Sequence, residues 1–200
     1  CPHDIKIYKN KIYVADSDNY RIQVFDLDGN FVSTIGSRDQ FDSQPYKLDV
    51  FNDKIFVVEM DKDRIQVFDL DGDFLFKFGK KGEDAGELRS PSDIAILGER
   101  VFVADSHNFR VQVFDVNGDF LTAIDSSAAY EGFSRPHSLA ILDDKIFVGD
   151  RVSIHIQVFE ISDLFLIETS IPDWIKNNAG WWADGSINDG SFLQGISYLI

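Results

Sequence analysis

Short apolar runs alternate with polar segments along most of the chain, and the whole pattern occurs four times. Each repeat has an apolar run, a polar turn, and a second run that ends in Val-Phe followed by an acid. The four centres read IYVADSDNYRIQVFD (12–26), IFVVEMDKDRIQVFD (55–69), VFVADSHNFRVQVFD (101–115) and IFVGDRVSIHIQVFE (146–160). Alternation over runs this short predicts β-strands.

The repeats keep a strict internal register. A proline opens each repeat at spacings of 43, 46 and 45 residues, and a phenylalanine follows each proline after 29 residues. These residues are Pro2, Pro45, Pro91 and Pro136, and Phe31, Phe74, Phe120 and Phe165. All length variation falls between the phenylalanine and the next proline, so packed units are joined there by surface loops.

One repeat predicts four antiparallel strands. In the first repeat, strand-forming runs lie within 3–8, 12–14, 22–25 and 31–35. Asp28-Gly29 signals a hairpin with a two-residue turn, because glycine accepts a positive φ. Four short strands in about 40 residues match one propeller blade. We therefore predict an all-β propeller with blades at about 2–44, 45–90, 91–135 and 136–169, breaking at about 37–44, 80–90 and 125–135. The fourth blade, with its altered segment 151–155, should be the least regular.

The repeats resemble the NHL repeat over residues 2–169. The resemblance is carried by a P-x-[DSK]-[IL] opening, a V-A-D-S-x-N-x-R-[IV]-Q-V-F-D centre and a D-G-x-F-[LV] hairpin. It implies a six-bladed ring, of which four blades are present and two are missing, most simply before residue 1. A complete four-bladed ring is the alternative. The first residues already lie inside a repeat and the last follow an apolar helical pattern, so we expect both ends to be cut.

Charge and composition limit the classes of partner that we expect the chain to bind. The formal net charge is -15 and the pI is about 4.5, which disfavours nucleic acid. No run of eighteen apolar residues predicts a membrane-spanning segment, and the single cysteine, Cys1, excludes an intrachain disulfide. We expect a protein, a peptide or a small molecule as the partner. The oligomeric state cannot be predicted from these features.

Residue types that recur in every blade are predicted to stabilise the blade itself. An acid ends the second strand and an arginine begins the third, where the two can pair across the turn. These residues are Asp16, Glu59, Asp105 and Asp150, and Arg21, Arg64, Arg110 and, in the arginine's place, His155. The Asp-Gly or Asn-Gly segments at 26–30, 69–73 and 115–119 lack the full calcium loop and its distal glutamate. Hairpin turns explain them, so we predict no calcium there.

The residues after the four prolines are the candidate ligand site, since they differ from blade to blade. They should ring one mouth of the central channel. They are His3, Tyr46, Ser92 and His137, followed by Asp4, Lys47, Asp93 and Ser138.

Two of these segments also resemble the Pro-His motifs of the peptidylglycine-amidating lyases. They are Pro2-His3-Asp4-Ile5 and Pro136-His137-Ser138-Leu139. In that family such histidines, from alternate blades, hold a catalytic zinc, which implies His3 and His137 as metal ligands here. The two lie three blades apart rather than two, and a third ligand would have to come from missing blades.

From 171 onward the chain changes character. Three tryptophans occur within nine residues, and breakers and caps predict a short helical segment over 171–200. This segment resembles a "WIKNNAGWWADG" module of predicted secreted and cell-surface proteins of ammonia-oxidising archaea. The tryptophans could pack there or on the last blade, or form a sticky surface for a partner or glycan.

The sequence thus predicts a non-enzymatic NHL propeller that binds a protein, peptide or small ligand outside the cell or at its surface. The alternative is a zinc-dependent lyase acting in the channel. The predicted cofactor is none, with zinc only under the alternative.

Overall fold

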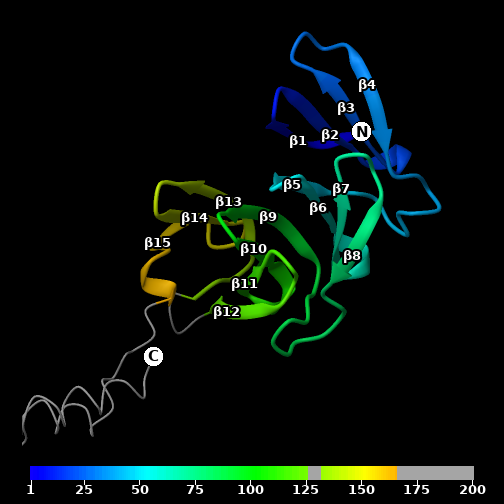
Figure 1. Cartoon of the computed structure of the whole chain (residues 1–200). Coiled ribbons are helices and arrows are strands. Elements are labelled where there is room, and N and C mark those ends of the chain that lie inside the picture. Colours follow the sequence, from blue (N-terminus) through cyan, green and yellow to red (C-terminus); the bar gives the residue numbers. More distant parts are fainter. Residues whose placement is uncertain (126–131, 166–200) are drawn as a thin grey trace, which may run out of the picture. The chain divides into compact units, whose positions relative to one another are not determined.

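The chain folds into four antiparallel sheets (Figure 1). The computed structural model describes residues 1–125 and 132–165. The strands of the first two sheets are β1 (Pro2–Tyr8), β2 (Lys11–Asp16), β3 (Arg21–Asp26) and β4 (Phe31–Ile35), then β5 (Lys47–Phe51), β6 (Lys54–Glu59), β7 (Arg64–Asp69) and β8 (Phe74–Phe78). Those of the last two are β9 (Pro91–Leu97), β10 (Arg100–Asp105), β11 (Arg110–Asp115) and β12 (Phe120–Ile124), then β13 (Pro136–Leu142), β14 (Lys145–Asp150) and β15 (Ile156–Glu160).

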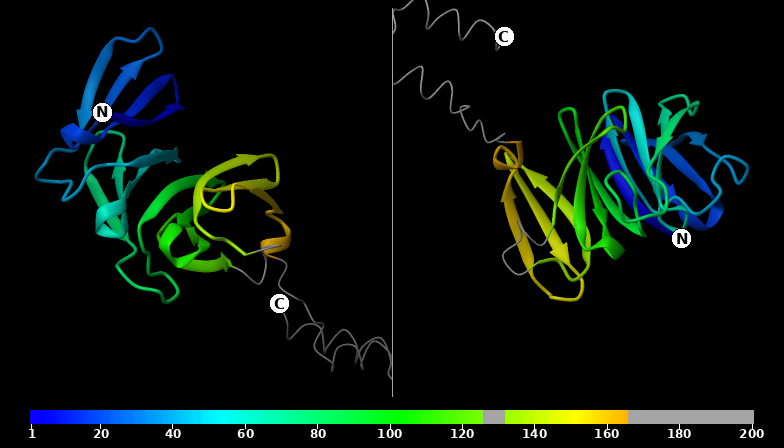
Figure 2. Two further views of the ribbon diagram at one scale, coloured as in Figure 1. Left: turned by 180° about the vertical axis from the view of Figure 1, so that it is seen from behind. Right: turned by 90° about the horizontal axis from the view of Figure 1, so that it is seen from below.

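Each of the first three sheets is a four-stranded meander, in which consecutive strands pair. The first strands of successive sheets are neighbours, β1 with β5, β5 with β9, and β9 with β13. Figure 2 shows the same sheets from two further sides. Meanders whose first strands adjoin are the arrangement of propeller blades. The predicted fold class, an all-β propeller, is confirmed, and each sheet is called a blade from here on. All four sheets lie in one compact unit, Cys1–Ile161.

In blades one to three, the hairpin at the outer edge has a longer turn than predicted. The four residues 27–30 separate β3 from β4, and the bond from the Asp26 amide to the Asn30 carbonyl closes a loop of the three residues 27–29 rather than two. Gly29 takes a φ of +84° there, a value that disfavours other residues. The Asp26 carboxylate accepts the amides of Asp28 and Asn30. The conserved spacing of the repeat therefore encodes an aspartate-capped turn.

The apolar core lies between blades. We call the face of a blade that packs on the following blade its far face, and the opposite one its near face. The junction between blades one and two and that between blades two and three each contain one cluster of buried apolar side chains. In both, the far face contributes side chains from one set of repeat positions and the near face contributes side chains from another. The first junction packs Tyr13, Ala15, Ile22 and Val24 on Leu48, Ile55, Val57 and Phe68. The second packs Phe56, Val58, Ile65 and Val67 on Ile94, Val101, Val103 and Phe114.

The fourth blade is the least regular of the four, as predicted. Blades one to three carry a short 3₁₀ turn between their second and third strands, η1 (Ser17–Asn19), η2 (Met60–Lys62) and η3 (Ser106–Asn108). In the fourth blade no such turn is formed and Ile154 takes a φ of +61°. Three strands of this blade are described. Residues Asp163–Phe165 form a 3₁₀ turn, η4, where the other blades have the glycine turn and the start of a strand, because Asp163 stands in the place of that glycine.

The predicted fourth strand beyond Phe165 and the helical, tryptophan-rich segment 171–200 lie outside the described residues. The number of blades in the complete ring stays a prediction. Within the described ranges, no helix is long and apolar enough to cross a membrane.

The junction core predicts a sharp contrast between two phenylalanines. Phe56 is fully buried between blades two and three, whereas Phe31 is 58% exposed. Phe56→Ala should lower the free energy of unfolding by about 3–5 kcal/mol, since it leaves a cavity. Phe31→Ala should stay within about 1 kcal/mol of the parent. Urea denaturation followed by circular dichroism measures both, and equal losses would contradict this placement of the core.

Candidate functional site

The acid at each blade centre holds its own blade together. In blade three the Asp105 carboxylate accepts the Nε of Arg110 at 2.9 Å and side-chain amides of Gln112 and Asn108, each at 2.9 Å. It also accepts the amide of Arg89, in the loop that enters the blade, at 2.7 Å. The predicted pairing of acid and arginine across the turn is therefore confirmed, and the acid ties down the incoming loop as well.

The same network recurs in blade two, where Glu59 accepts Arg64 at 2.6 Å and the amide of Ser43 at 3.0 Å. In blade one Asp16 accepts Arg21 at 2.9 Å. Burial alone would raise the pKa of Asp16, but the hydrogen bonds from Asn19 and Arg21 outweigh it and lower the pKa. The hydrogen-bond partners described for these acids belong to the same blade or to the loop that enters it. We therefore assign these acids no further chemistry.

Blade four replaces the arginine with His155, and its acid changes partners. The Asp150 carboxylate accepts four backbone amides, from Ser134, Arg135, Val152 and Ser153, at 2.7–2.9 Å. The acid thus keeps its hold on the incoming loop without an arginine. Arg151 and His155 are both exposed.

The predicted mouth residues fall into two groups. His3, Tyr46 and His137 present rings: those of His3 and Tyr46 meet edge to face with centroids 5.0 Å apart, and His137 is half-buried. Ser92, by contrast, is buried and its hydroxyl lies 2.6 Å from that of Ser106. Ser92 therefore belongs to the junction between blades three and four rather than to an open surface.

The acids of the mouth connect neighbouring blades. Asp4 accepts the amide of Leu48 at 3.0 Å and faces Lys47 at 3.5 Å. Asp93 accepts the amide of Leu139 at 2.8 Å. Burial raises the pKa of the Asp93 carboxyl against the lowering effects of the Leu139 amide and Lys47.

Asp49, which the sequence did not single out, makes the same kind of bond to the amide of Ile96 at 2.9 Å. A carboxylate on the inner strand of each of the first three blades thus bonds to the backbone of the next inner strand. The repeat register did not predict the bond made by Asp49, because Asp49 lies two residues further along its strand than Asp4 and Asp93 do along theirs.

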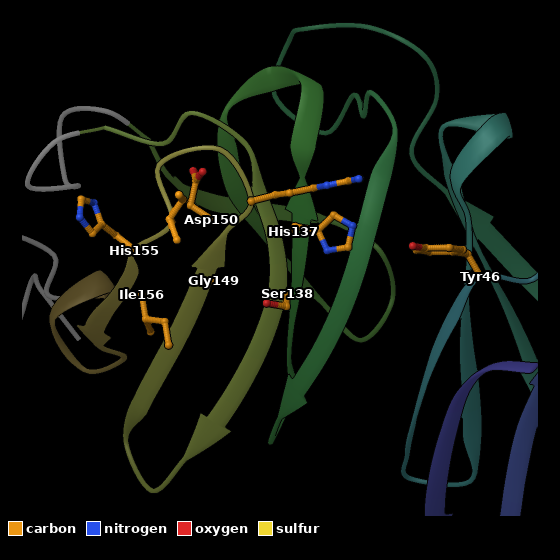
Figure 3. Close-up of a pocket in the computed structure, with 9 residues that line it drawn as sticks. Tyr46, His137, Ser138, Gly149, Asp150, His155 and Ile156 are labelled. Atoms are coloured by element: carbon orange, nitrogen blue, oxygen red, sulfur yellow. The ribbon is translucent and has the colours of Figure 1, made fainter.

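A hollow of about 580 Å³ lies beside blade four (Figure 3). A volume of roughly 300–1,000 Å³ is typical of small-ligand sites. Three of the predicted residues line the hollow, Tyr46, His137 and Ser138. Figure 3 shows the Tyr46 side chain pointing from the second blade towards His137. The remaining lining residues are Gly149, Asp150, Arg151, Ile154, His155 and Ile156.

Those six lining residues were not predicted to form part of a site. The sequence feature that could have indicated them is the break in the repeat pattern of blade four, where Arg151 stands at the position of Ser17 and Ser106. A close approach also marks this wall, since a Cβ at Gly149 would lie 2.4 Å from the Ser138 hydroxyl oxygen. A larger residue at position 149 would displace the Ser138 hydroxyl from this position.

His137 lies among cations. Burial lowers the pKa of its imidazole, and Arg151, Lys47 and Arg135 lower it further. The ring is therefore neutral at pH 7 and can both donate and accept a hydrogen bond. The hollow offers that ring, the phenol of Tyr46 and the hydroxyl of Ser138 as polar groups, with Ile154 and Ile156 as apolar ones.

The zinc hypothesis needs three protein ligands around one point. Across residues 1–125 and 132–165, no three side chains of His, Cys, Asp or Glu are grouped to hold a metal ion. His3 instead packs on Tyr46. The described residues alone do not supply the three ligands of a catalytic zinc site.

Comparison with known families agrees with the geometry. The NHL repeat family matches residues 1–25 and 88–114, and a family described as a 6-bladed beta-propeller matches residues 38–97. Two segments of the chain thus match the NHL repeat, and the segment between them matches a propeller family. No curated protein matches the chain.

Solved structures share the propeller fold at low identity. The hydrazine synthase of Kuenenia stuttgartiensis is 16% identical with a TM-score of 0.63, and the match covers 81% of this chain and 46% of that one. The computationally designed Ika4 protein is 18% identical with a TM-score of 0.57, covering 80% and 91%. The designed Ika8 protein is 14% identical with a TM-score of 0.57, covering 80% and 46%. The chain thus spans less than half of the synthase chain, and such identities show the fold alone.

The cations around His137 generate a prediction for its titration. Arg151→Gln removes a positive charge, so the pKa of His137 should rise. NMR titration of the imidazole measures it, with Arg38→Gln as the control, because Arg38 stacks on Tyr20 instead. An unchanged His137 pKa in Arg151→Gln would show that Arg151 does not act on the ring.

The sign of the effect on stability follows from the lowered pKa. The unfolded chain takes up a proton at its ordinary value of 6.5, before the folded chain does. The stability that the neutral His137 contributes is therefore present above pH 6.5 and is lost as the pH falls through the lower folded value.

Proposed function

We propose that this NHL propeller is a non-enzymatic binding module whose ligand site is the hollow at the mouth of the channel. The observation that supports this most directly is that Tyr46, His137 and Ser138, from two different blades, line one space of ligand size. Residues that vary between blades fit a site built once from several blades. Polar donors beside exposed isoleucines are suited to a small molecule or a short peptide.

The tail supports a location outside the cell or at its surface through its resemblance to the archaeal module. The acidic composition is consistent with a partner that is not a nucleic acid. The location outside the cell or at its surface and a partner other than nucleic acid are both parts of the proposal.

A screen of small molecules and tripeptides tests the site. Binders should shift the NMR signals of the Tyr46 and His137 rings. Tyr46→Ala and His137→Ala should each weaken binding by about tenfold or more, since each removes a wall and a polar group. Phe109→Ala, at an exposed turn of blade three, is the matched control and should bind as the parent does. Binders that ignore both variants would place the ligand elsewhere.

Zinc content separates this proposal from the lyase alternative. We expect the purified chain to hold no stoichiometric zinc and His137→Ala to give the same result. Metal analysis by mass spectrometry measures it. One zinc per chain in the parent, absent from His137→Ala, would favour the lyase.

A further inference from the structure

Tyr46 and His137, two of the rings that line the hollow, each follow a proline at a place where regular strand pairing does not hold them (Figure 3). The pairing of β13 with β14 passes from Pro136 directly to Ser138, so His137 lies in a bulge. A bulge leaves its extra residue unpaired. Tyr46 precedes the first residue of β5, and its amide makes one backbone bond, to the Val58 carbonyl. The direction of each ring therefore needs a further contact to fix it.

A buried serine of the preceding blade holds the carbonyl group in front of each ring. Ser17 donates its hydroxyl hydrogen to the Pro45 carbonyl, and Ser106 donates to the Pro136 carbonyl. Both serines are at most 2% exposed. Each carbonyl belongs to the planar peptide that joins the proline to the ring residue. The hydrogen bond therefore fixes the orientation of the peptide from which the ring residue continues.

The occurrence of this serine follows the hollow and not the blade repeat. Ser17 and Ser106 are the first residues of η1 and η3, and Met60 takes the same place in η2. The next blade after Met60 begins with Pro91 and Ser92, and Ser92 is a buried residue of the junction between blades three and four. The serine thus stands at the two internal junctions where the next blade presents a proline-linked ring to the hollow.

A second hydroxyl holds the other side of His137. The Ser92 hydroxyl oxygen lies 2.6 Å from that of Ser106 and 3.1 Å from the carbonyl oxygen of His137. Beside it, Asp93 accepts the amide of Leu139 at 2.8 Å. Blade three therefore holds the peptides before and after His137, although the ring itself lines the hollow beside blade four.

We propose that Ser17 and Ser106 are positioning residues of the ligand site, each setting the direction of one ring in the next blade. Ser17 acts on Tyr46, and Ser106 acts on His137 together with Ser92. Their role in binding rests on the proposed function, whereas their effect on the two rings can be measured without a ligand. Side chains of a binding site keep their geometry only where supporting hydrogen bonds hold them.

NMR spectra of the two rings test the proposal. Ser106→Ala should shift the imidazole signals of His137 and move its lowered pKa towards the ordinary value of 6.5, because the ring loses its fixed place among the cations. The ring signals of Tyr46 should stay as in the parent. Ser17→Ala should shift the Tyr46 signals and leave those of His137 unchanged. Met60→Ser, at the same place in blade two, is the matched control and should change neither ring.

The separation of the two effects is what a merely structural serine would not produce. Circular dichroism checks that the variants fold, and Ser92→Ala gives a second route to His137 if Ser106→Ala does not fold. Variants that alter both rings alike, or that alter neither, would overturn the proposal.

Binding then separates this proposal from the proposed function. For the tightest binder from the screen, Ser17→Ala and Ser106→Ala should each weaken binding by about threefold to tenfold, the range of one hydrogen bond. If His137→Ala weakens binding while the serine variants change neither the rings nor binding, the positioning role alone is wrong. If the rings shift as expected but binders ignore Tyr46→Ala and His137→Ala, the positioning role stands and the proposed function is wrong.

Discussion

The carboxylate at the centre of each blade is the interaction on which the rest depends. Asp105 shows it fully: one side chain receives an arginine, two amide side chains and the backbone of the loop that enters the blade. Buried acids are costly unless each oxygen is satisfied. Here the partners come from the second turn, the third strand and the preceding loop, so satisfying the acid fixes the blade and its connection together.

Much of the fold could be predicted from the sequence because the repeat encodes local rules. Strand alternation, the Asp-Gly turn and the acid–arginine pair all act within one blade, and all were found where the register placed them. The length of the turn was not, because the Asp26 amide bonds to the Asn30 carbonyl and so encloses the three residues 27–29 rather than the expected two. In blade four, Asp163 stands where the other blades have the turn glycine, and Asp163–Phe165 form a 3₁₀ turn that the repeat register did not predict.

The candidate site was harder to predict, because it depends on contacts between blades. Asp4, Ser92 and Asp93 occupy variable positions, as a ligand site would, yet their bonds reach the neighbouring blade. A single sequence does not reveal which amide lies across a junction. Tyr46, His137 and Ser138, from two blades, line one hollow. Arg151 also lines it and belongs to the irregular segment of blade four, to which no function was assigned from the sequence.

Each loop that enters a blade is held by a backbone amide at a fixed number of residues before the next proline, whatever the length of the loop. The captured amides belong to Ser43, Arg89 and Ser134, each two residues before its proline. Upstream of the first two of those amides, each loop also inserts a fully buried side chain, Phe41 or Leu88, into a junction core. An exchangeable recognition sequence would therefore have to be grafted between the previous outer strand and that buried anchor, where the loops differ in length.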